Sequence, residues 1–209
     1  MRFVFDHLVV TAPTLDSGAE FVAQALGVAP GPGGEHPRMG THNRLLRLGE
    51  TAFLEVVAPN PAAPRPDRPR WFALDDAAAL RAPRLAGWVA RTDDLRAGAQ
   101  ELLAATGLIE TMTRGGREWI ITIPVDGALP LGGALPMLIE WQSPRTPAGA
   151  GLPEAGCTLS ALGLRHPQPQ RLRELLALAG LADAAVVAQG APGLWAEVVT
   201  PRGARRLGA

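Results

Sequence analysis

The chain has 209 residues, of which 47% are apolar and 19% charged, so one globular domain can bury its core without disulfides or structural metals. Its twenty basic and twenty acidic residues balance, and no positive field is available to attract a nucleic-acid backbone. All basic residues are arginine and tyrosine is absent, which excludes a Schiff-base lysine, a P-loop lysine and a tyrosine acid or base.

The single cysteine, Cys157, excludes an intrachain disulfide framework. No apolar run approaches the roughly 18 residues of a membrane span. The opening sequence MRFVFDHLVV is interrupted by Asp6 and His7 and is too short for a signal peptide. We therefore expect a cytoplasmic protein that binds neither nucleic acid nor membranes.

The first 60 residues predict a strand, a helix and two further strands. Residues 3–11 alternate as a β-strand does, and Thr14 or Asp16 can cap a helix that ends at Gly27. Residues 30–34 predict a loop, and residues 42–48 and 52–58 predict a hairpin. The proline-rich residues 59–69 predict an exposed connector, which a short helix over 71–80 follows.

The same order of elements then starts again. Strands are predicted over 85–92, 118–123 and 135–142, with a helix over 95–105 that Gly107 ends. After a linker over 144–153, a third start predicts a strand over 158–165, a helix over 169–179 and strands over 184–189 and 194–200. We therefore divide a single domain into module one (1–60), a connector (61–84), module two (85–144) and a partial third module (155–203).

Three closing strands carry one short motif. They read FLEVVAP from Phe53, LIEWQSP from Leu138 and WAEVVTP from Trp195, each with a glutamate four residues before a proline. Repetition of a supersecondary unit is itself structural evidence. The patterns together predict an α+β fold of repeated βαβββ modules, whose curved mixed sheets carry their helices outside and leave a concave side for a ligand.

Five segments carry a likeness to known proteins: FDHLVV, HPRMGTHNRLLRLG, TAFLEVVAPNP, LAGWVARTDDL and LPMLIEWQ. They resemble the vicinal oxygen chelate superfamily and, within it, the glyoxalase-like domain family of bacterial proteins, over nearly the whole chain. The resemblance implies a divalent metal held by the opening and closing strands of paired modules, at His7, Glu55, Trp88 and Glu140. Trp88 cannot bind a metal, and here the chain departs from the family pattern.

Strand alternation places His7, Glu55 and Glu140 on otherwise apolar faces, with His7 beside Phe5. A buried ionisable group is costly unless it is paired or liganded, and a shared cation would meet that cost. One imidazole and two carboxylates suit Mn, Fe, Co, Ni or Mg better than structural zinc, although Zn stays a candidate. The alternatives are a metal-free pocket of the same residues and purely structural roles.

The start of the predicted strand that follows Gly40 supplies further candidates. Thr41, His42 and Asn43 can bind a substrate oxygen, or they can merely cap backbone groups. We take His42 as an acid or base, in preference to His36 in a loop before a proline. Glu55 is either a ligand or the catalytic base.

Two further residues are candidate substrate contacts. Trp88 can line a cavity, or it can simply pack in the core. Arg117 can bind an anionic substrate, or it can be a solvated surface arginine.

Two functions follow from this set of residues. The first is an enzyme that acts on a small oxygenated molecule, a metal-dependent lyase, isomerase or dioxygenase in which the metal is a Lewis acid. The second is a metal-free small-molecule-binding protein of the drug-sequestering kind. By resemblance, two copies of the chain can also pair as a homodimer.

Overall fold

The computed structural model describes residues 2–208, and two βαβββ units build its larger sheet. The first unit contains β1 (Val4–Thr11), α1 (Leu15–Leu26), β2 (Gly31–His36), β3 (Thr41–Arg47) and β4 (Phe53–Pro59). The second unit contains β5 (Arg84–Arg91), α2 (Gln100–Thr106), β6 (Leu108–Arg114), β7 (Arg117–Ile123) and β8 (Met137–Ser143). Three short 3-10 helices complete this part of the chain: Pro37–Met39, Pro130–Gly133 and Ala148–Gly151.

Helix α1 shows how local signals set these bounds. The Thr14 hydroxyl accepts the Ser17 backbone N–H at 3.2 Å, which caps the first turn. Gly27 ends the helix in the left-handed conformation, with a φ of 74°. Val22 and Leu26 are buried, so one face of α1 packs on the protein while the other meets solvent.

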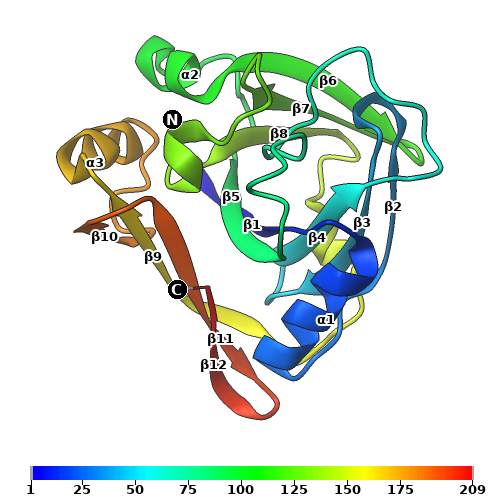
Figure 1. Ribbon diagram of the computed structural model, residues 1–209. Coiled ribbons are helices and arrows are strands. Elements are labelled where there is room, and N and C mark those ends of the chain that lie inside the picture. Colours follow the sequence, from blue (N-terminus) through cyan, green and yellow to red (C-terminus); the bar gives the residue numbers. More distant parts are fainter. Residues whose placement is uncertain (1, 209) are drawn as a thin grey trace.

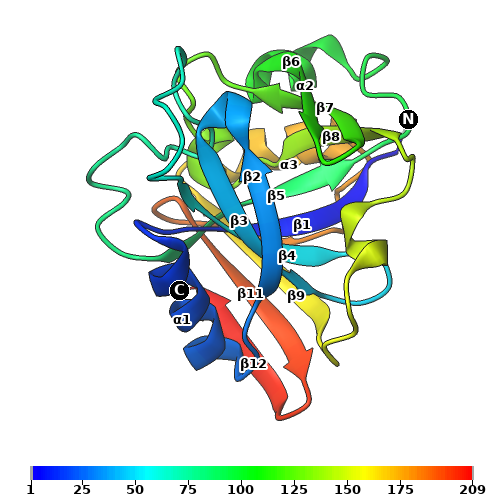
Figure 2. The same ribbon diagram turned by 90° about the vertical axis from the view of Figure 1, so that its right-hand side faces the viewer.

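The eight strands run in the order β2-β3-β4-β1-β5-β8-β7-β6, and β1 and β5 pair antiparallel at the centre. The sheet curls, so that its edge strands β2 and β6 approach each other (Figures 1 and 2). We call the place where β2 and β6 meet the seam. Arg38 spans it and donates to the Glu110 carboxylate and to the Thr111 carbonyl oxygen of β6. The predicted α+β fold of repeated modules, with curved mixed sheets and helices outside, is confirmed.

Strand alternation separates the apolar side chains into two layers. Val9, Phe53 and Ile139 belong to an inner layer within the curl. Leu54 and Leu138 belong to an outer layer, between the convex face and the elements that cover it. Neighbouring residues of one strand therefore face different layers, and this decides where each candidate side chain lies.

The third unit has the same order of elements but a different pairing. It contains β9 (Thr158–His166), α3 (Pro169–Leu178), β10 (Val186–Gln189), β11 (Gly193–Thr200) and β12 (Gly203–Gly208). Its four strands form a separate sheet in the order β10-β9-β11-β12 (Figure 1). Whereas β4 is parallel to its opening strand β1, β11 is antiparallel to β9. The shared FLEVVAP and WAEVVTP motifs thus occupy strands with different neighbours.

Several elements differ from the sequence expectations. Residues 31–34, expected as a loop, belong to β2, an edge strand where glycine and proline are tolerated. Strands β6 and β12 were not predicted, and α2 begins at Gln100 instead of residue 95. Residues 71–80 form turns in place of the expected helix, and residues 60–83 cross the open end of the curl (Figure 1).

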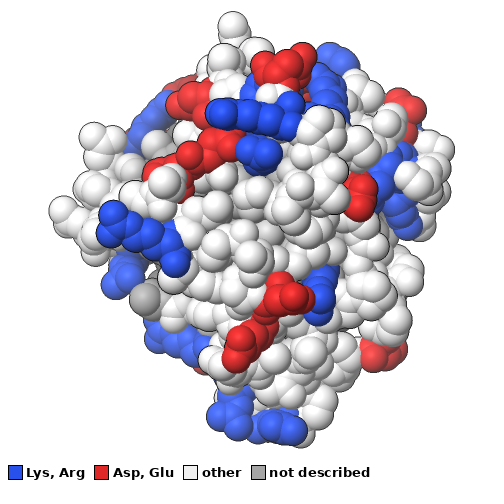
Figure 3. Space-filling model, turned by 45° about the vertical axis from the view of Figure 1, so that its right-hand side comes forward, with Lys and Arg blue, Asp and Glu red and all other residues white. Residues whose placement is uncertain are grey.

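Among the described residues, no helix is both long enough and apolar enough to cross a membrane. Acidic and basic side chains are interspersed on the face that Figure 3 shows. Such mixing agrees with the balanced composition of the chain.

Candidate functional site

The hollow inside the curled sheet narrows to a small cavity of about 30 Å³. A space of this size holds only one or two water molecules. Five polar side chains line it: His7, His36, Asn43, Glu55 and Arg114. Aromatic rings form much of the remaining wall: Phe53, Trp71, Phe72, Trp119 and Trp141.

A β-bulge sets the positions of Asp6 and His7, of which His7 lines the cavity. The pairing of β1 with β5 shifts between Phe5 and His7, and Asp6 is the extra residue. Asp6 is fully buried, with Oδ1 2.6 Å from His7 Nδ1 and Oδ2 accepting from Trp141 Nε1 at 3.0 Å. The expected shared face of Phe5 and His7 is wrong, because the bulge breaks the alternation and leaves Phe5 stacked on Trp88 in the outer layer.

Glu55 faces His7 from the adjacent strand. Its Oε2 lies 3.6 Å from His7 Nε2, and its Oε1 accepts from Asn43 Nδ2 at 2.6 Å. A carboxylate only accepts, so His7 Nδ1 carries the hydrogen toward Asp6 and its Nε2 is directed to Glu55. Asp6, His7 and Glu55 thus form a buried line of acidic and basic groups.

A close approach of β2 to β3 positions Asn43. The Gly34 N–H donates to Asn43 Oδ1 at 2.8 Å. A side chain on Gly33 would place its Cβ 2.2 Å from that oxygen and 2.3 Å from the Asn43 backbone oxygen. Only glycine fits here, and the Asn43 amide is therefore held in one orientation toward Glu55.

Arg114 closes the cavity from the other side of the seam. Its Nη1 donates to His36 Nε2 at 3.0 Å and to Asn43 Oδ1 at 3.1 Å. Burial, together with the nearby Arg114 charge, lowers the pKa of His36 to about 3. His36 is therefore neutral near pH 7, and its Nδ1 lies 3.2 Å from the Thr41 hydroxyl.

The connector supplies the aromatic cover. Trp71 is 3% exposed and packs edge-on against His36, with ring centroids 4.9 Å apart. Phe72 and Ala73 both adopt a φ of 56°, in the left-handed region that non-glycine residues rarely occupy. A strained backbone thus holds Trp71 and Phe72 over the polar groups.

The cavity brings together three of the candidates named from sequence, His7, Glu55 and Asn43. Thr41 is buried beside them and contacts His36. Four others, His42, Trp88, Arg117 and Glu140, are absent from the lining of the cavity.

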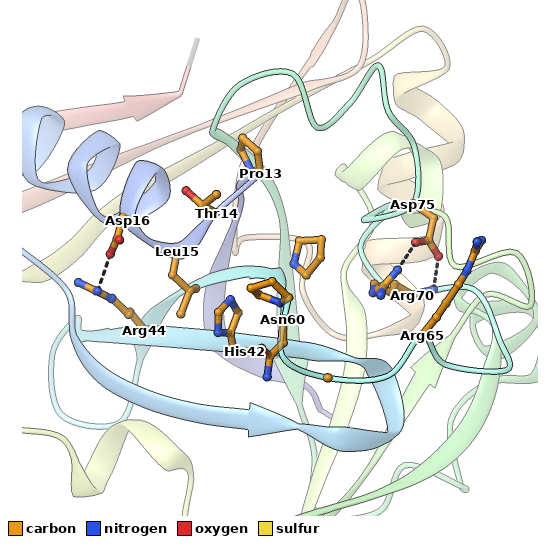
Figure 4. A pocket seen from close by; sticks show the side chains of 13 residues that line it. Pro13, Thr14, Leu15, Asp16, His42, Arg44, Asn60, Arg65, Arg70 and Asp75 are labelled. Atoms are coloured by element: carbon orange, nitrogen blue, oxygen red, sulfur yellow. Dashed lines mark hydrogen bonds and ion pairs between the residues drawn. The ribbon is translucent and has the colours of Figure 1, made fainter.

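His42 lies on the opposite face of β3 from Asn43. It lines an outer groove of about 870 Å³ with Arg44, Asn60, Arg70 and residues at the start of α1 (Figure 4). Partial burial lowers the pKa of His42, and the Glu35 charge opposes that effect. The structure therefore does not bring His42 to Glu55 as an acid or base.

Glu140 and Trp88 both face the outer layer. Glu140 Oε2 accepts the Leu95 N–H at 2.8 Å, while its neighbours Ile139 and Trp141 line the cavity. The expected meeting of Glu140 with His7 and Glu55 fails, because alternation on β8 turns it to the convex face. Trp88 donates to the Ala134 carbonyl oxygen at 3.0 Å and is core.

Arg117 is half-buried at the surface. It donates to the Thr146 carbonyl oxygen at 3.0 Å, and its guanidinium carbon lies 5.8 Å from the centre of the Trp141 ring. Its contacts are therefore structural, outside the cavity.

Sequence reasoning missed Asp6, His36 and Arg114. The FDH sequence was a local signal for Asp6, because an acid beside a histidine can orient it. His36 was placed in an exposed loop, yet it ends β2 and is 6% exposed. Arg114 ends β6, a strand that the sequence did not reveal.

The residues do not fit the metal that the family resemblance implies. His7 Nε2 and Glu55 Oε2 are two facing donors, whereas zinc centres take three or four protein ligands and non-haem iron centres take three. Over residues 2–208, no three His, Cys, Asp or Glu side chains are grouped to hold an ion. The amide oxygen of Asn43 already accepts from Gly34 and Arg114.

Comparison with known proteins gives one family match, to the glyoxalase-like domain, over residues 5–180. A crystal structure of a hypothetical protein from Staphylococcus aureus is similar at 14% identity and a TM-score of 0.58, covering 100% of this chain and 86% of that one. Methylmalonyl-CoA epimerase from Mycobacterium tuberculosis is 18% identical at a TM-score of 0.42, covering 65% and 84% respectively. No curated protein matches the chain.

Proposed function

The chain belongs to the glyoxalase-like domain family of the vicinal oxygen chelate superfamily, and we propose that it binds a small oxygenated molecule in its inner cavity and moves a proton on it. His7 and Glu55 are the proposed proton-transfer groups. The proposal uses only side chains of this chain, since the donors present do not make a metal centre.

The observation that carries the proposal is the line Asp6–His7–Glu55. Asp6 orients the imidazole through Nδ1, as the third member of a nucleophile–base–orienter set does. His7 Nε2 and the Glu55 carboxylate, 3.6 Å apart, then line one small space from two strands. Two neighbouring groups that can each exchange a proton with one bound molecule are what general acid–base catalysis needs.

The class of reaction follows from where each proton is taken and delivered. Glu55 takes a proton from a carbon next to a carbonyl, and protonated His7 delivers one to the carbonyl oxygen, which gives an enol. Return of a proton to another position completes an isomerisation, whereas loss of a leaving group completes a lyase reaction. Neither outcome requires an oxidant or a reductant.

Deuterium exchange tests this directly. In D₂O, wild-type protein should speed the exchange of the carbon-bound hydrogens of pyruvate or hydroxyacetone, followed by proton NMR, at least ten-fold over buffer. Glu55→Gln and His7→Gln should abolish the acceleration, and His42→Gln, on the opposite face of β3, should keep it. No acceleration by the wild-type protein with either compound would refute the proposed chemistry.

A second candidate function, sequestration without chemistry, is favoured by the aromatic lining of the cavity. Phe53, Trp71, Trp119 and Trp141 would offer flat apolar surfaces to a ring-bearing ligand, which the cavity of about 30 Å³ admits only once the Trp71–Phe72 cover moves. Saturable binding of small aromatic compounds, without any deuterium exchange, would support this function instead. A homodimer and a cytoplasmic location stay predictions of the sequence.

A further inference from the structure

We infer that the cavity recognises a carboxylate, so that the ligand is a short monocarboxylic acid anchored by Arg114 and by the indole N–H of Trp71. The inference rests on the proposed function in one respect, namely that the ligand occupies the same cavity as His7 and Glu55. The seam of the curled sheet is then an anion site beside the acid–base pair.

The first support is the uncompensated charge of Arg114. Its hydrogen bonds go to two neutral acceptors, His36 Nε2 and Asn43 Oδ1, and within residues 2–208 no carboxylate lies within ion-pair distance of it. Burial lowers the pKa of its guanidinium, an effect that the more distant Glu55 charge opposes. Arginine nevertheless stays protonated in proteins, so a partly buried cation lacks a counter-ion.

The second support is an unsatisfied donor on an aromatic residue that lines the same cavity. Trp71 Nε1 is buried and has no hydrogen-bond acceptor. Buried N–H groups in proteins are nearly always hydrogen-bonded, and an indole N–H can only donate, so this group needs an acceptor. The Trp71 ring packs on His36, which in turn accepts from Arg114. One carboxylate placed in this cavity offers acceptors to both the guanidinium and the indole.

The length of the ligand follows from Asn43. Its single amide group bridges Arg114, through Oδ1, and Glu55, through Nδ2. A molecule that meets the guanidinium at one end and Glu55 at the other is therefore only a few atoms long. Because the cavity of about 30 Å³ has room for only one or two water molecules, even such a short acid enters only when the strained Trp71–Phe72 cover moves.

The route to the site also passes Arg114. This side chain lines both the inner cavity and an outer groove of about 620 Å³, where Arg117 is a second cation and Glu35 and Glu118 are carboxylates. An anion that enters from the groove therefore meets Arg114 before it meets His7 or Glu55. Arg114 is then a binding residue, whereas His7 and Glu55 act on the far end of the molecule.

Binding of pyruvate compared with its neutral methyl ester tests the inference, measured by ligand-observed NMR titration. Wild-type protein should bind pyruvate at least ten-fold more tightly than methyl pyruvate. Arg114→Gln should remove this preference, and Trp71→Phe, which keeps a ring but deletes the N–H, should reduce it several-fold. Arg44→Gln, an arginine on the outer face of β3, should leave it unchanged.

Equal affinity for acid and ester, equal behaviour of Arg114→Gln and Arg44→Gln, or no binding of pyruvate and lactate would each overturn the inference. If Arg114→Gln fails to fold, Arg114→Lys serves instead, since it keeps the charge without the bidentate fork and should retain only part of the preference. Glu55→Gln should still bind pyruvate while losing deuterium exchange. Carboxylate binding and the proposed chemistry can thus fail separately.

Discussion

Acid should destabilise this protein through His36. The pKa of His36 is about 3 in the folded protein, against 6.5 for an ordinary histidine, because burial and the Arg114 charge disfavour the imidazolium. Between these two values the unfolded chain binds a proton that the folded chain does not. Stability is therefore intact above pH 6.5 and is lost progressively as the pH falls toward 3.

The size of the effect follows from proton linkage. A pKa difference is worth about 1.4 kcal/mol per unit, so lowering the pH from 7 to 4.5 should remove about 2–3 kcal/mol of unfolding free energy through this one side chain. That is a large share of the ~5–15 kcal/mol that a domain possesses. Asp75 and Glu110, whose pKa values their arginine partners lower, add losses of the same sign at still lower pH.

Urea unfolding of wild-type protein and His36→Gln at pH 7, 5.5 and 4.5 isolates the contribution of His36. Glutamine keeps hydrogen-bonding atoms but does not titrate, so the variant should lose about 2–3 kcal/mol less than the wild type over this range. His42→Gln is the matched control and should change the slope much less, because that imidazole is only partly buried. Parallel pH profiles for wild type and His36→Gln would refute the assignment.

Two substitutions test the packing around the site. Gly33→Ala should lower the free energy of unfolding in urea by about 1–3 kcal/mol and disturb Asn43, because the new Cβ would clash with the Asn43 oxygens. Gly31→Ala is the control and should cost little, because the nearest atom to its Cβ is 3.7 Å away. Glu140→Ala should lower stability by about 1–3 kcal/mol by leaving the buried Leu95 N–H without an acceptor, while deuterium exchange continues. If Glu140→Ala lost deuterium exchange, Glu140 would have to take part in the proposed chemistry.

Much of the fold was predictable because apolar alternation marks the strands at its centre. The strands that contain Val9, Leu54 and Ile139 are buried on both sides and read clearly in the sequence. Edge strands β2 and β6 have a partly exposed face, and β2 consists largely of glycine and proline. Their pairing depends on the curl of the whole sheet, which no local pattern encodes.

The site was only half predictable for a related reason. Alternation tells which residues of a strand share a face, but it does not tell which face becomes concave. Glu55 and Glu140 therefore looked equivalent, although one lines the cavity and the other caps Leu95. The bulge at Asp6 was a further obstacle, since one extra residue reverses every assignment beyond it.

The three glutamate motifs show that sequence repetition need not repeat function. Glu55 faces the inner cavity, Glu140 the outer layer, and Glu197, on the second sheet, is exposed beside Ser160. What the motifs share is the apolar register that keeps a strand in a sheet, and a carboxylate acquires chemistry only where the curl gives it partners. In this chain the proposed acid–base pair, His7 and Glu55, comes from the first unit, and Arg114, which has no ion-pair partner among residues 2–208, comes from the second. A ligand that contacts both groups therefore draws on the two modules at once, and the seam between β2 and β6 is where they meet.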